Sequence, residues 1–235
     1  MSTRTALLIG ATGLVGGHCL ELLLRDAAYG RVVTLGRKAL PLEHPKLAQH
    51  VIDFARLRDD ASLVRAQDIY SCLGTTIKKA GTREAFREVD FTYQYEVARA
   101  AAANGAEQLL LVSALGANAR SAVFYNRVKG ELEEAVSKLP LAGVQIFRPS
   151  LLLGERAEFR LGERVAELPM RYVSFLMVGP LAKFRPVHAR TVAKAMLLIA
   201  RQRPQGTNIF ESDRIRALGG EGVTSKELKK RGEES

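Results

Sequence analysis

Three residues whose side chains can move or stabilise a proton occur within a short stretch of the sequence. Tyr125 and Lys129 are four residues apart, so a helix would place the phenol and the ammonium on one face and within mutual reach. Ser113 stands at the end of the apolar run that precedes them. A hydroxyl that polarises a carbonyl, a phenol that donates a proton and a cation that favours the phenolate predict a carbonyl-reduction site.

Such a site also needs a hydride carrier, and the first residues of the chain indicate where one would bind. The short apolar run at residues 6–9 ends in glycine, and helical spacing begins a few residues later. Glycines in this context permit a tight turn, a close approach of the backbone to a pyrophosphate and packing of the helix on the strand. Amide groups and the positive end of the helix dipole favour the phosphates. The residues expected to contact a dinucleotide are Gly10, Thr12, Gly13, Leu14, Val15 and Gly16, and a glycine turn without a ligand is the alternative.

The end of the second predicted strand indicates which dinucleotide is bound. An acidic residue there would bond to the adenosine ribose, whereas a basic residue accommodates a 2′-phosphate. The sequence has Arg37 and Lys38 at this place and no acid, which favours NADP(H) over NAD(H). Arg37 is expected to make the main contact because its planar guanidinium matches a phosphate. A pair of solvent-exposed cations is the alternative interpretation.

Further candidate residues follow the third and fourth predicted strands. Asp53 ends the third strand, and Leu73, Gly74 and Thr75 end the fourth, at the carboxyl edge where open α/β sheets bind ligands. We expect these residues to border the adenine and ribose of the cofactor. Capping of a helix is an equally good interpretation of Asp53, because a short acid performs that role well.

The segments that must position these residues alternate between strand-like and helix-like patterns. Continuous apolar runs predict strands at residues 6–9, 31–35, 49–53, 68–73, 108–112, 144–147 and 208–211. Helical spacing predicts helices at residues 14–24, 86–104, 124–139 and 189–202. Strands that are apolar throughout are expected where helices cover both faces of a parallel sheet. The predicted fold is therefore α/β, a doubly wound Rossmann-like parallel sheet.

Residues 1–235 are predicted to form a single dinucleotide-binding domain with a small carboxyl-terminal subdomain. The regular alternation stops at residues 148–150, and the residues beyond are too few for an independent core. We therefore expect a substrate subdomain within residues 150–212, and a charged, loosely ordered tail at residues 213–235. An apolar cluster in this region either lines a hydrophobic substrate pocket or packs the subdomain. Its members are Met170, Tyr172, Phe175, Leu176 and Met177.

Composition excludes several other classes of protein. A chain with 47% hydrophobic and 26% charged residues is neither disordered nor fibrous. Its two cysteines, Cys19 and Cys72, lie in apolar stretches and cannot build a disulfide framework or a zinc cluster, so no metal is expected. The absence of a signal-peptide core and of an apolar run long enough to span a bilayer predicts a cytoplasmic protein without a membrane span.

The net charge of +10 raises the question of polyanionic partners. Most of the cations alternate with acids along the chain, and no groove-reading motif accompanies them. A solvated basic surface is therefore expected, nucleic-acid binding is not, and the expected partner is a small-molecule substrate.

Taken together, these segments resemble the short-chain dehydrogenase/reductase superfamily, in particular its extended or atypical branch. The resemblance rests on the glycine loop, on the set of Ser113, Tyr125 and Lys129, and on residues 147–150. Residues 72–76, 79–81, 89–90 and 125–131 look like the oxidoreductases related to the HIV Tat-interacting protein. That similarity spans nearly all of residues 5–212.

The resemblance implies a Rossmann fold, NADPH binding and the catalytic roles given above. It also implies that Pro149, Ser150 and Leu151 line the nicotinamide side of the cofactor, and family analogy suggests a homodimer through the helices at 86–104 and 124–139. Two departures stand out: Asp90 occupies a position where many extended members have asparagine, and the carboxyl-terminal part is shorter than in sugar-nucleotide epimerases.

The leading functional hypothesis is an NADPH-dependent reductase of a small carbonyl compound. The alternative is an NADPH-sensing regulatory or scaffold protein without turnover. The set of Ser113, Tyr125 and Lys129 favours the enzyme, because a sensor needs the phosphate loop but no acid/base pair.

Overall fold

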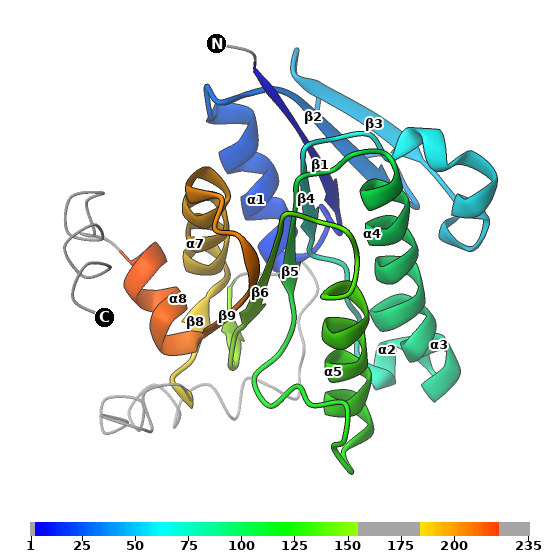
Figure 1. The fold of residues 1–235 in the computed structure, drawn as a ribbon, viewed down its shortest axis with the longest axis vertical. Helices are drawn as coiled ribbons and strands as arrows, with labels where there is room; N and C mark the ends of the chain where they lie inside the picture. Colours follow the sequence, from blue (N-terminus) through cyan, green and yellow to red (C-terminus); the bar gives the residue numbers. More distant parts are fainter. Residues whose placement is uncertain (1–2, 155–183, 221–235) are drawn as a thin grey trace.

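The computed structural model describes residues 3–154 and 184–220. Within these ranges seven parallel strands form one sheet in the order β3-β2-β1-β4-β5-β6-β9 (Figure 1). The strands are β1 (Arg4–Ile9), β2 (Tyr29–Gly36), β3 (Leu47–Val51), β4 (Asp68–Ser71), β5 (Gln108–Val112), β6 (Gly143–Arg148) and β9 (Gly206–Glu211). A separate parallel pair is formed by β7 (Leu152–Leu153) and β8 (Val187–His188).

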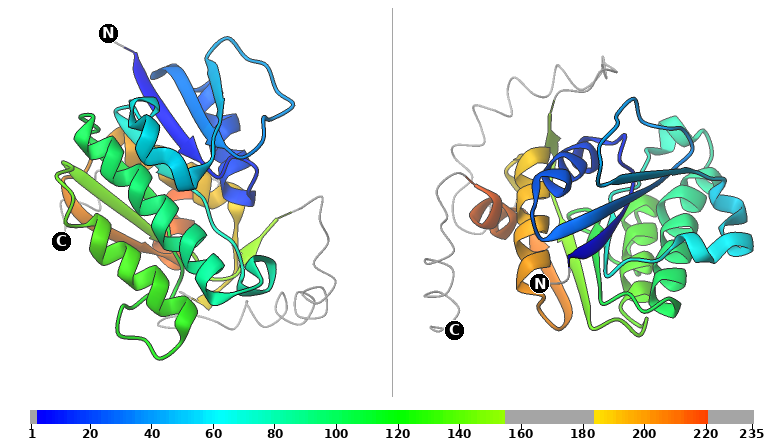
Figure 2. Two further views of the ribbon diagram at one scale, coloured as in Figure 1. Left: turned by 90° about the vertical axis from the view of Figure 1, so that its right-hand side faces the viewer. Right: turned by 90° about the horizontal axis from the view of Figure 1, so that it is seen from above.

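Helices cover both faces of the sheet and give a three-layered molecule (Figure 2). One face carries α1 (Leu14–Arg25), α7 (Ala189–Gln202) and α8 (Ser212–Gly219). The other face carries the 3-10 helix η1 (Phe54–Leu63), α4 (Tyr93–Ala103) and α5 (Phe124–Val136). The prediction of a doubly wound, Rossmann-like α/β fold is confirmed.

Strand β1 shows why the central strands are apolar throughout. Ala6 and Leu8 pack in the core beneath α1 and α7, whereas Leu7 and Ile9 pack in the core beneath α4 and η1. All four side chains are fully buried. Because successive side chains of a strand point to opposite faces, a strand covered on both sides buries both sets of side chains and favours apolar residues throughout.

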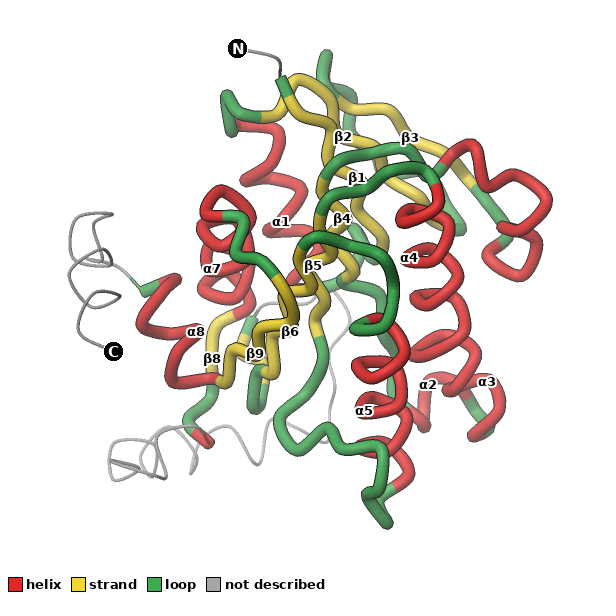
Figure 3. The backbone as a smooth tube through the Cα atoms, in the orientation of Figure 1, coloured by secondary structure: helices red, strands yellow, loops and turns green. Residues whose placement is uncertain are grey.

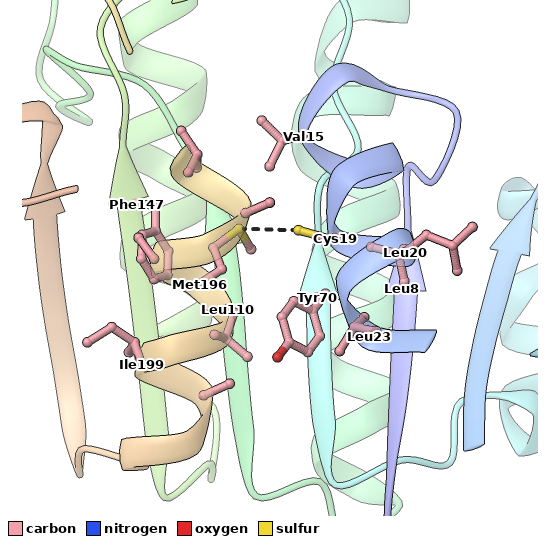
Figure 4. Close-up of a cluster of buried hydrophobic side chains, with 14 of the residues drawn as sticks. Leu8, Val15, Cys19, Leu20, Leu23, Tyr70, Leu110, Phe147, Met196 and Ile199 are labelled. Carbon is pink, nitrogen blue, oxygen red and sulfur yellow. Dashed lines mark hydrogen bonds between the residues drawn. The ribbon is translucent and has the colours of Figure 1, made fainter. Parts of the chain in front are cut away.

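A buried cluster joins α1, α7 and the sheet (Figure 4). The Sγ atom of Cys19 on α1 lies 3.9 Å from Sδ of Met196 on α7 and 3.9 Å from Sγ of Cys72 after β4. The Cys72 thiol and burial both raise the pKa of the Cys19 thiol. A fully protonated thiol in an apolar setting is unreactive, so Cys19 acts as a small hydrophobic residue.

The helix predicted at residues 86–104 is divided into three segments. It consists of α3 (Arg83–Arg87), the π-helical turn η2 (Glu88–Thr92) and α4, and it is preceded by the short helix α2 (Ile77–Ala80). In η2 the Tyr93 N–H donates to the Glu88 carbonyl, five residues earlier. A π-helical turn changes the direction of the side chains that it carries, and regular helical spacing cannot predict it.

Residues beyond 148 extend the main sheet. Strand β9 pairs with β6 along its whole length, and α7 packs against α1 in the same layer. Residues 155–183, which include the apolar cluster at 170–177 of the predicted subdomain, lie outside the described residues. The prediction of a loosely ordered tail from residue 213 is wrong for the first turns, since these form α8 with Ser212 and Ile215 fully buried. The segment is rich in charged residues, so its sequence did not indicate that one face of the helix is buried.

Candidate functional site

The glycine loop turns tightly between β1 and α1. Gly10 has a φ of +81°, and a Cβ on it would lie 2.4 Å from the carbonyl carbon and oxygen of Cys72. A Cβ on Gly16 would lie 2.1 Å from the Gly10 carbonyl oxygen. Glycine is therefore required for the loop to lie between β4 and the start of α1. In the described part of the chain no side chain caps α1 at Gly13, which leaves its first N–H groups free to bind an anion.

A cavity of about 440 Å³ opens beside this loop at the carboxyl edge of the sheet. Its wall includes Gly10 and Thr12 of the loop, Arg37 and Lys38 after β2, and Leu73 after β4. The volume is typical of ligand sites, and the carboxyl edge is where open α/β sheets bind dinucleotides. The close backbone approach and the apolar wall fit the adenosine half of a dinucleotide, and two cations lie at the rim.

Gln49 on β3 fixes the loop that bears the two cations. Its side-chain Oε1 accepts the Leu40 N–H at 2.8 Å, and its Nε2 donates to the Leu42 carbonyl at 2.8 Å. Arg37 and Lys38 themselves are exposed at the rim of the cavity. The backbone of this loop is thus held in place while the cationic side chains stay accessible to a ligand.

The other residues predicted around the adenosine half have structural contacts. Val15 and Gly16 are buried in α1, and Leu14 packs at the edge of the same core. The carboxylate of Asp53 accepts the Ala55 N–H at 3.0 Å and caps η1. The structure therefore shows the capping role that was one of the two interpretations of Asp53.

Lys129 is buried where α5, η2 and the loop after β4 meet. Its Nζ lies 2.8 Å from Oδ1 of Asp90, and the two side chains are 4% and 1% exposed. Oδ2 of Asp90 accepts the Thr75 N–H at 2.8 Å. A Cβ on Gly74 would lie 3.9 Å from Nζ, so the ammonium lies next to this glycine. The loop after β5, the start of α5 and helices α2 and α3 lie at this end of the molecule (Figure 3).

The charge of Lys129 is stabilised by its neighbours. Burial by itself lowers the pKa of Lys129, but Asp90, Tyr125 and Glu133 raise it, and the net pKa lies above its ordinary value. The ammonium is therefore charged at neutral pH, and the structure brings it within electrostatic reach of the Tyr125 phenol.

Two packing features hold this face of α5 in place. The fully buried Phe86 ring lies 5.5 Å, centroid to centroid, from the Tyr125 ring. A Cβ on Gly130 would lie 2.2 Å from the backbone of Asn118 and Ala119, so the loop between β5 and α5 crosses the helix directly beside Lys129. Only glycine allows that crossing.

Ser113 has a partner that the sequence did not indicate. Its buried hydroxyl, just beyond β5, donates to the carboxylate of Glu133 on α5. The same carboxylate accepts hydrogen bonds from the Arg148 guanidinium, and this raises the pKa of Arg148. The structure brings Tyr125 and Lys129 together, whereas it engages the Ser113 hydroxyl in this second ion pair.

The residues expected on the nicotinamide side follow β6 at the same edge. The Pro149 carbonyl accepts the Leu115 N–H at 2.9 Å, and the Ser150 N–H donates to the Ser212 hydroxyl at 2.5 Å. Leu151 is 38% exposed. These contacts tie the end of β6 to the loop after β5 and to α8.

Sequence reasoning missed the two buried carboxylates of this region. Asp90 was distinguished only by its departure from a family pattern, because its approach to Lys129 depends on a π-helical turn. Glu133 was detectable, since Tyr125, Lys129 and Glu133 recur at intervals of four on one helix face.

Comparison with known proteins identifies relatives along most of the sequence, although no protein-family model matches it. The chain is 32% identical over 220 residues to Protein FMP52, mitochondrial, of Candida albicans, which covers 91% of this chain and 94% of that protein. It is 35% identical over 170 residues to Protein HTATIP2 of Rattus norvegicus, which covers 71% of this chain and 70% of that protein.

Solved structures share the fold at low sequence identity. MoeE5 in complex with UDP-glucose and NAD has a TM-score of 0.66 and 14% identity, over 92% of this chain and 81% of that chain. A short-chain dehydrogenase/reductase superfamily protein from Agrobacterium tumefaciens with bound NAD has a TM-score of 0.64 and 12% identity, over 88% and 77%. These likenesses show that the chain shares the fold of these proteins.

The relatives correct one prediction made from the sequence. The cytoplasmic location is wrong, because the FMP52 relatives from three yeasts are mitochondrial proteins by name. Unpaired cysteines indicate reducing conditions, and such conditions do not identify one compartment. Among the described residues no helix has the length and apolar character needed to cross a membrane, and no group of three potential metal ligands occurs.

The family assignment rests on identity above 30% to relatives of which this chain covers 70% and 94%. The parallel sheet agrees with the fold of the solved structures. The chain belongs to the HTATIP2/FMP52 family and has the extended short-chain dehydrogenase/reductase fold.

Proposed function

We propose that this protein is an NADP(H)-dependent oxidoreductase that transfers a hydride to or from a small carbonyl or alcohol substrate. One observation carries the proposal: the phenol of Tyr125 lies on the same helix face as a buried, charged Lys129, at the sheet edge that also holds the glycine loop. A cofactor-binding scaffold without chemistry has no need of a buried cation beside a phenol.

The residues of the chain have separate roles in this reaction. Tyr125 donates its proton to the carbonyl oxygen and takes it back in the reverse direction. Lys129 stabilises the phenolate that remains, and its charge is fixed by its surroundings. Ser113 is proposed as a second donor to the carbonyl oxygen, a role that requires its hydroxyl to turn from Glu133 to the substrate.

The bound nicotinamide would supply or accept the hydride. Arg37 and Lys38 at the rim of the cavity support a preference for NADP(H), because neither is an acid that would bind the ribose of NAD. The remaining contacts proposed for the cofactor are those of the glycine loop, of Asp53 and residues 73–75, and of residues 149–151. Two-fold pairing of the chain stays part of this proposal, since α4 and α5 lie side by side on one face of the sheet (Figure 2).

Substitution of Tyr125→Phe tests the proposed reaction. The variant keeps the ring that packs on Phe86 but lacks the proton, so turnover of a carbonyl panel should fall by about 100-fold or more while NADPH affinity is retained. NADPH oxidation and NADPH fluorescence measure the two quantities separately. Tyr95→Phe, on α4 and stacked on Phe91, is the matched control and should leave both unchanged. Undiminished turnover in the Tyr125 variant would remove this residue from the mechanism.

A second function, an NADPH-sensing regulatory or scaffold protein, is favoured by one specific observation. The Ser113 hydroxyl is engaged by Glu133, so that within residues 3–154 and 184–220 Tyr125 is the one proposed catalytic hydroxyl without such an internal partner. A sensor binds NADPH tightly and oxidises none of it in the presence of any carbonyl of the panel. An enzyme turns over, and Ser113→Ala then lowers its rate.

A further inference from the structure

We infer that the substrate is an anionic carbonyl compound, whose carboxylate or phosphate is bound by Arg83 and Arg127, the arginine pair, beside Tyr125. This substrate class rests on the proposed function, because it concerns the same site. Two guanidinium groups lie against one aromatic ring here. The Cζ atoms of Arg83 and Arg127 are 5.3 Å and 5.7 Å from the centroid of the Phe124 ring. Phe124 directly precedes Tyr125 on α5.

A single buried ring joins the arginine pair to the phenol. The Phe86 ring of α3 lies 5.8 Å from the Phe124 ring and 5.5 Å from the Tyr125 ring, centroid to centroid. Phe86 is fully buried, so it holds both rings where α3 meets the first turn of α5. The arginine pair therefore belongs to the same packed cluster as the group proposed to donate the proton.

The guanidinium groups are held in position by neutral partners. A cation over the face of an aromatic ring is attracted by the quadrupole of the ring. Nη1 of Arg127 also donates to the carbonyl oxygens of Ser121 and Ala122, at 2.9 Å and 3.5 Å. Within residues 3–154 and 184–220 its Nε and Nη2 make no hydrogen bond, so these donors remain for a ligand. A planar guanidinium that is already positioned loses little side-chain freedom when it binds an anion.

No carboxylate of the described residues forms an ion pair with either member of the arginine pair. The neighbouring Arg87 of α3 differs, because Glu131 of α5 lies against its guanidinium. Glu84 directly follows Arg83, and consecutive residues of a helix do not face each other. The two positive charges are therefore available to an anion from outside the chain, and the net charge of +10 favours the approach of one.

Exposed apolar side chains at the same edge of the sheet indicate a hydrocarbon part in the substrate. Val123 is the N-cap residue of α5, Ile77 begins α2, and Leu151 follows β6. All three side chains are exposed. They follow the carboxyl ends of parallel strands, as Tyr125 does, and ligands of open α/β sheets bind at this edge. An aryl or alkyl group that carries both the carbonyl and the anion fits such a surface.

A matched pair of aldehydes tests the contribution of the substrate charge. 4-Carboxybenzaldehyde and 4-formylbenzamide have nearly the same size and shape, but only the first is an anion at neutral pH. With NADPH as the hydride donor, kcat/KM of the wild type should be higher for the carboxylate by about tenfold or more, which is the contribution of one charge-assisted hydrogen bond.

A third aldehyde, 4-formylphenyl phosphate, distinguishes the two anions. A higher kcat/KM for this probe than for 4-carboxybenzaldehyde would identify phosphate as the group that is bound, and the reverse order would identify carboxylate. Either order supports an anionic substrate, provided that the neutral amide is the poorest of the three. A kcat/KM for the neutral amide that equals or exceeds those of both anions would overturn the inference.

Substitutions of the arginine pair test which residues select the anion. Arg83→Met and Arg127→Met remove the charges and keep apolar side chains that can pack on Phe124. Each variant should lower kcat/KM for 4-carboxybenzaldehyde about tenfold more than kcat/KM for 4-formylbenzamide. An equal fall for both aldehydes would indicate a structural role alone and contradict the inference. Because Arg83 is exposed, its variant keeps the test available if Arg127→Met does not fold.

Arg214→Met is the matched control. Arg214 of α8 also lies over an aromatic ring, with Cζ 5.0 Å from the centroid of the Phe210 ring. Its substitution removes the same charge from the protein and should leave the preference for the carboxylate unchanged. An equal loss of preference in this control would mean that the net charge of the protein, and not the arginine pair, selects the anion, and would overturn the inference.

Binding of terephthalate separates this inference from the proposed function. Terephthalate is a dianion without an aldehyde, so calorimetric titration in the presence of NADPH measures its affinity without turnover. Its affinity should fall about tenfold in Arg83→Met and stay unchanged in Arg214→Met. Absence of binding to the wild type, or equal affinity in the wild type and Arg83→Met, would overturn the inference. Absence of turnover of all three aldehydes, with terephthalate bound as expected, would contradict the proposed function alone.

Discussion

The proposed preference for NADP(H) rests on Arg37. Its exposed guanidinium stands at the rim of the cavity, on a loop that Gln49 holds to β3. A fixed backbone with an accessible planar cation suits a phosphate, since such a contact loses little conformational entropy on binding.

Substitution of Arg37→Ala should weaken NADPH binding and leave NADH binding unchanged. Loss of a charge-assisted hydrogen bond of about 1.5–3 kcal/mol corresponds to about 10- to 100-fold in affinity. Calorimetric titration with both nucleotides measures the difference. Arg31→Ala, an exposed arginine near the other end of β2, is the control and should bind both as the wild type does. Equal weakening for NADPH and NADH would show that Arg37 does not contact a 2′-phosphate.

For single residues, the sequence predicts which side chains share a helix face better than it predicts their contacts with residues of other elements. The spacing of Tyr125 and Lys129 correctly placed two side chains on one helix face, because helical geometry alone determines it. The contact of Ser113 with Glu133 depends on rotamers and on Arg148 from another strand. Local spacing contains no information about such a contact.

The phosphate loop is the element whose geometry is most restrictive. Gly10 combines a positive φ with contact to the end of β4, so both the turn and the β1–β4 packing depend on it. Gly105 has nearly the same φ of +82°, but a Cβ there would meet nothing within 4 Å. Substitution of Gly105 therefore measures the cost of backbone strain alone, whereas substitution of Gly10 adds the effect of displacing the phosphate loop.

We expect Gly10→Ala to lower both stability and NADPH affinity. The left-handed conformation costs about 1–2 kcal/mol, and the clash with Cys72 at 2.4 Å forces the loop away from β4. Gly105→Ala should show the first cost alone and bind NADPH normally. Chemical unfolding and fluorescence titration measure the two effects. Normal NADPH affinity in Gly10→Ala would show that the cofactor does not use this loop.

Helices and strands were predictable from the sequence where one hydrophobic periodicity extends over the whole segment. The strand at 108–112 and the helix at 189–202 match the structure to the residue, because the strand contains a continuous apolar run and the helix is strongly amphipathic. The segment at 86–104 contains a π-helical turn that adds one residue to a single turn. That irregularity places Asp90 on Lys129, so the part of the element that matters for the site is the part that periodicity misses.

In the molecule as a whole, a buried stabilising network and the candidate site lie at opposite ends of the parallel strands. At the amino ends of the strands the fully buried Asp68 accepts hydrogen bonds from Arg4, Tyr29 and Gln108. At the carboxyl ends lie the cavity and the Lys129 ion pair. The Asp68 network joins β1, β2, β4 and β5 and contains no residue of the candidate site. Substitutions in the candidate site therefore leave this network in place.

The sheet as a whole was predictable from apolar strands alternating with helices, but its full extent was not. Strand β9 pairs with β6 although Ile209 is 43% exposed, and α8 contacts β9 on the face that buries Phe210. A strand with one covered face and mostly polar residues resembles a surface segment in sequence. The boundary expected at residues 148–150 therefore falls within a continuous sheet.

A titration of the purified wild-type protein with NADPH and, separately, with NADH at physiological salt tests whether the glycine loop and Arg37 form an NADP(H) site. Nicotinamide fluorescence reports occupancy of the cavity beside the glycine loop. NADPH should bind saturably and more tightly than NADH by about tenfold or more, which is the contribution of one phosphate contact. Absence of binding by both nucleotides would contradict the assignment of the glycine loop and, with it, both the reductase and the sensor.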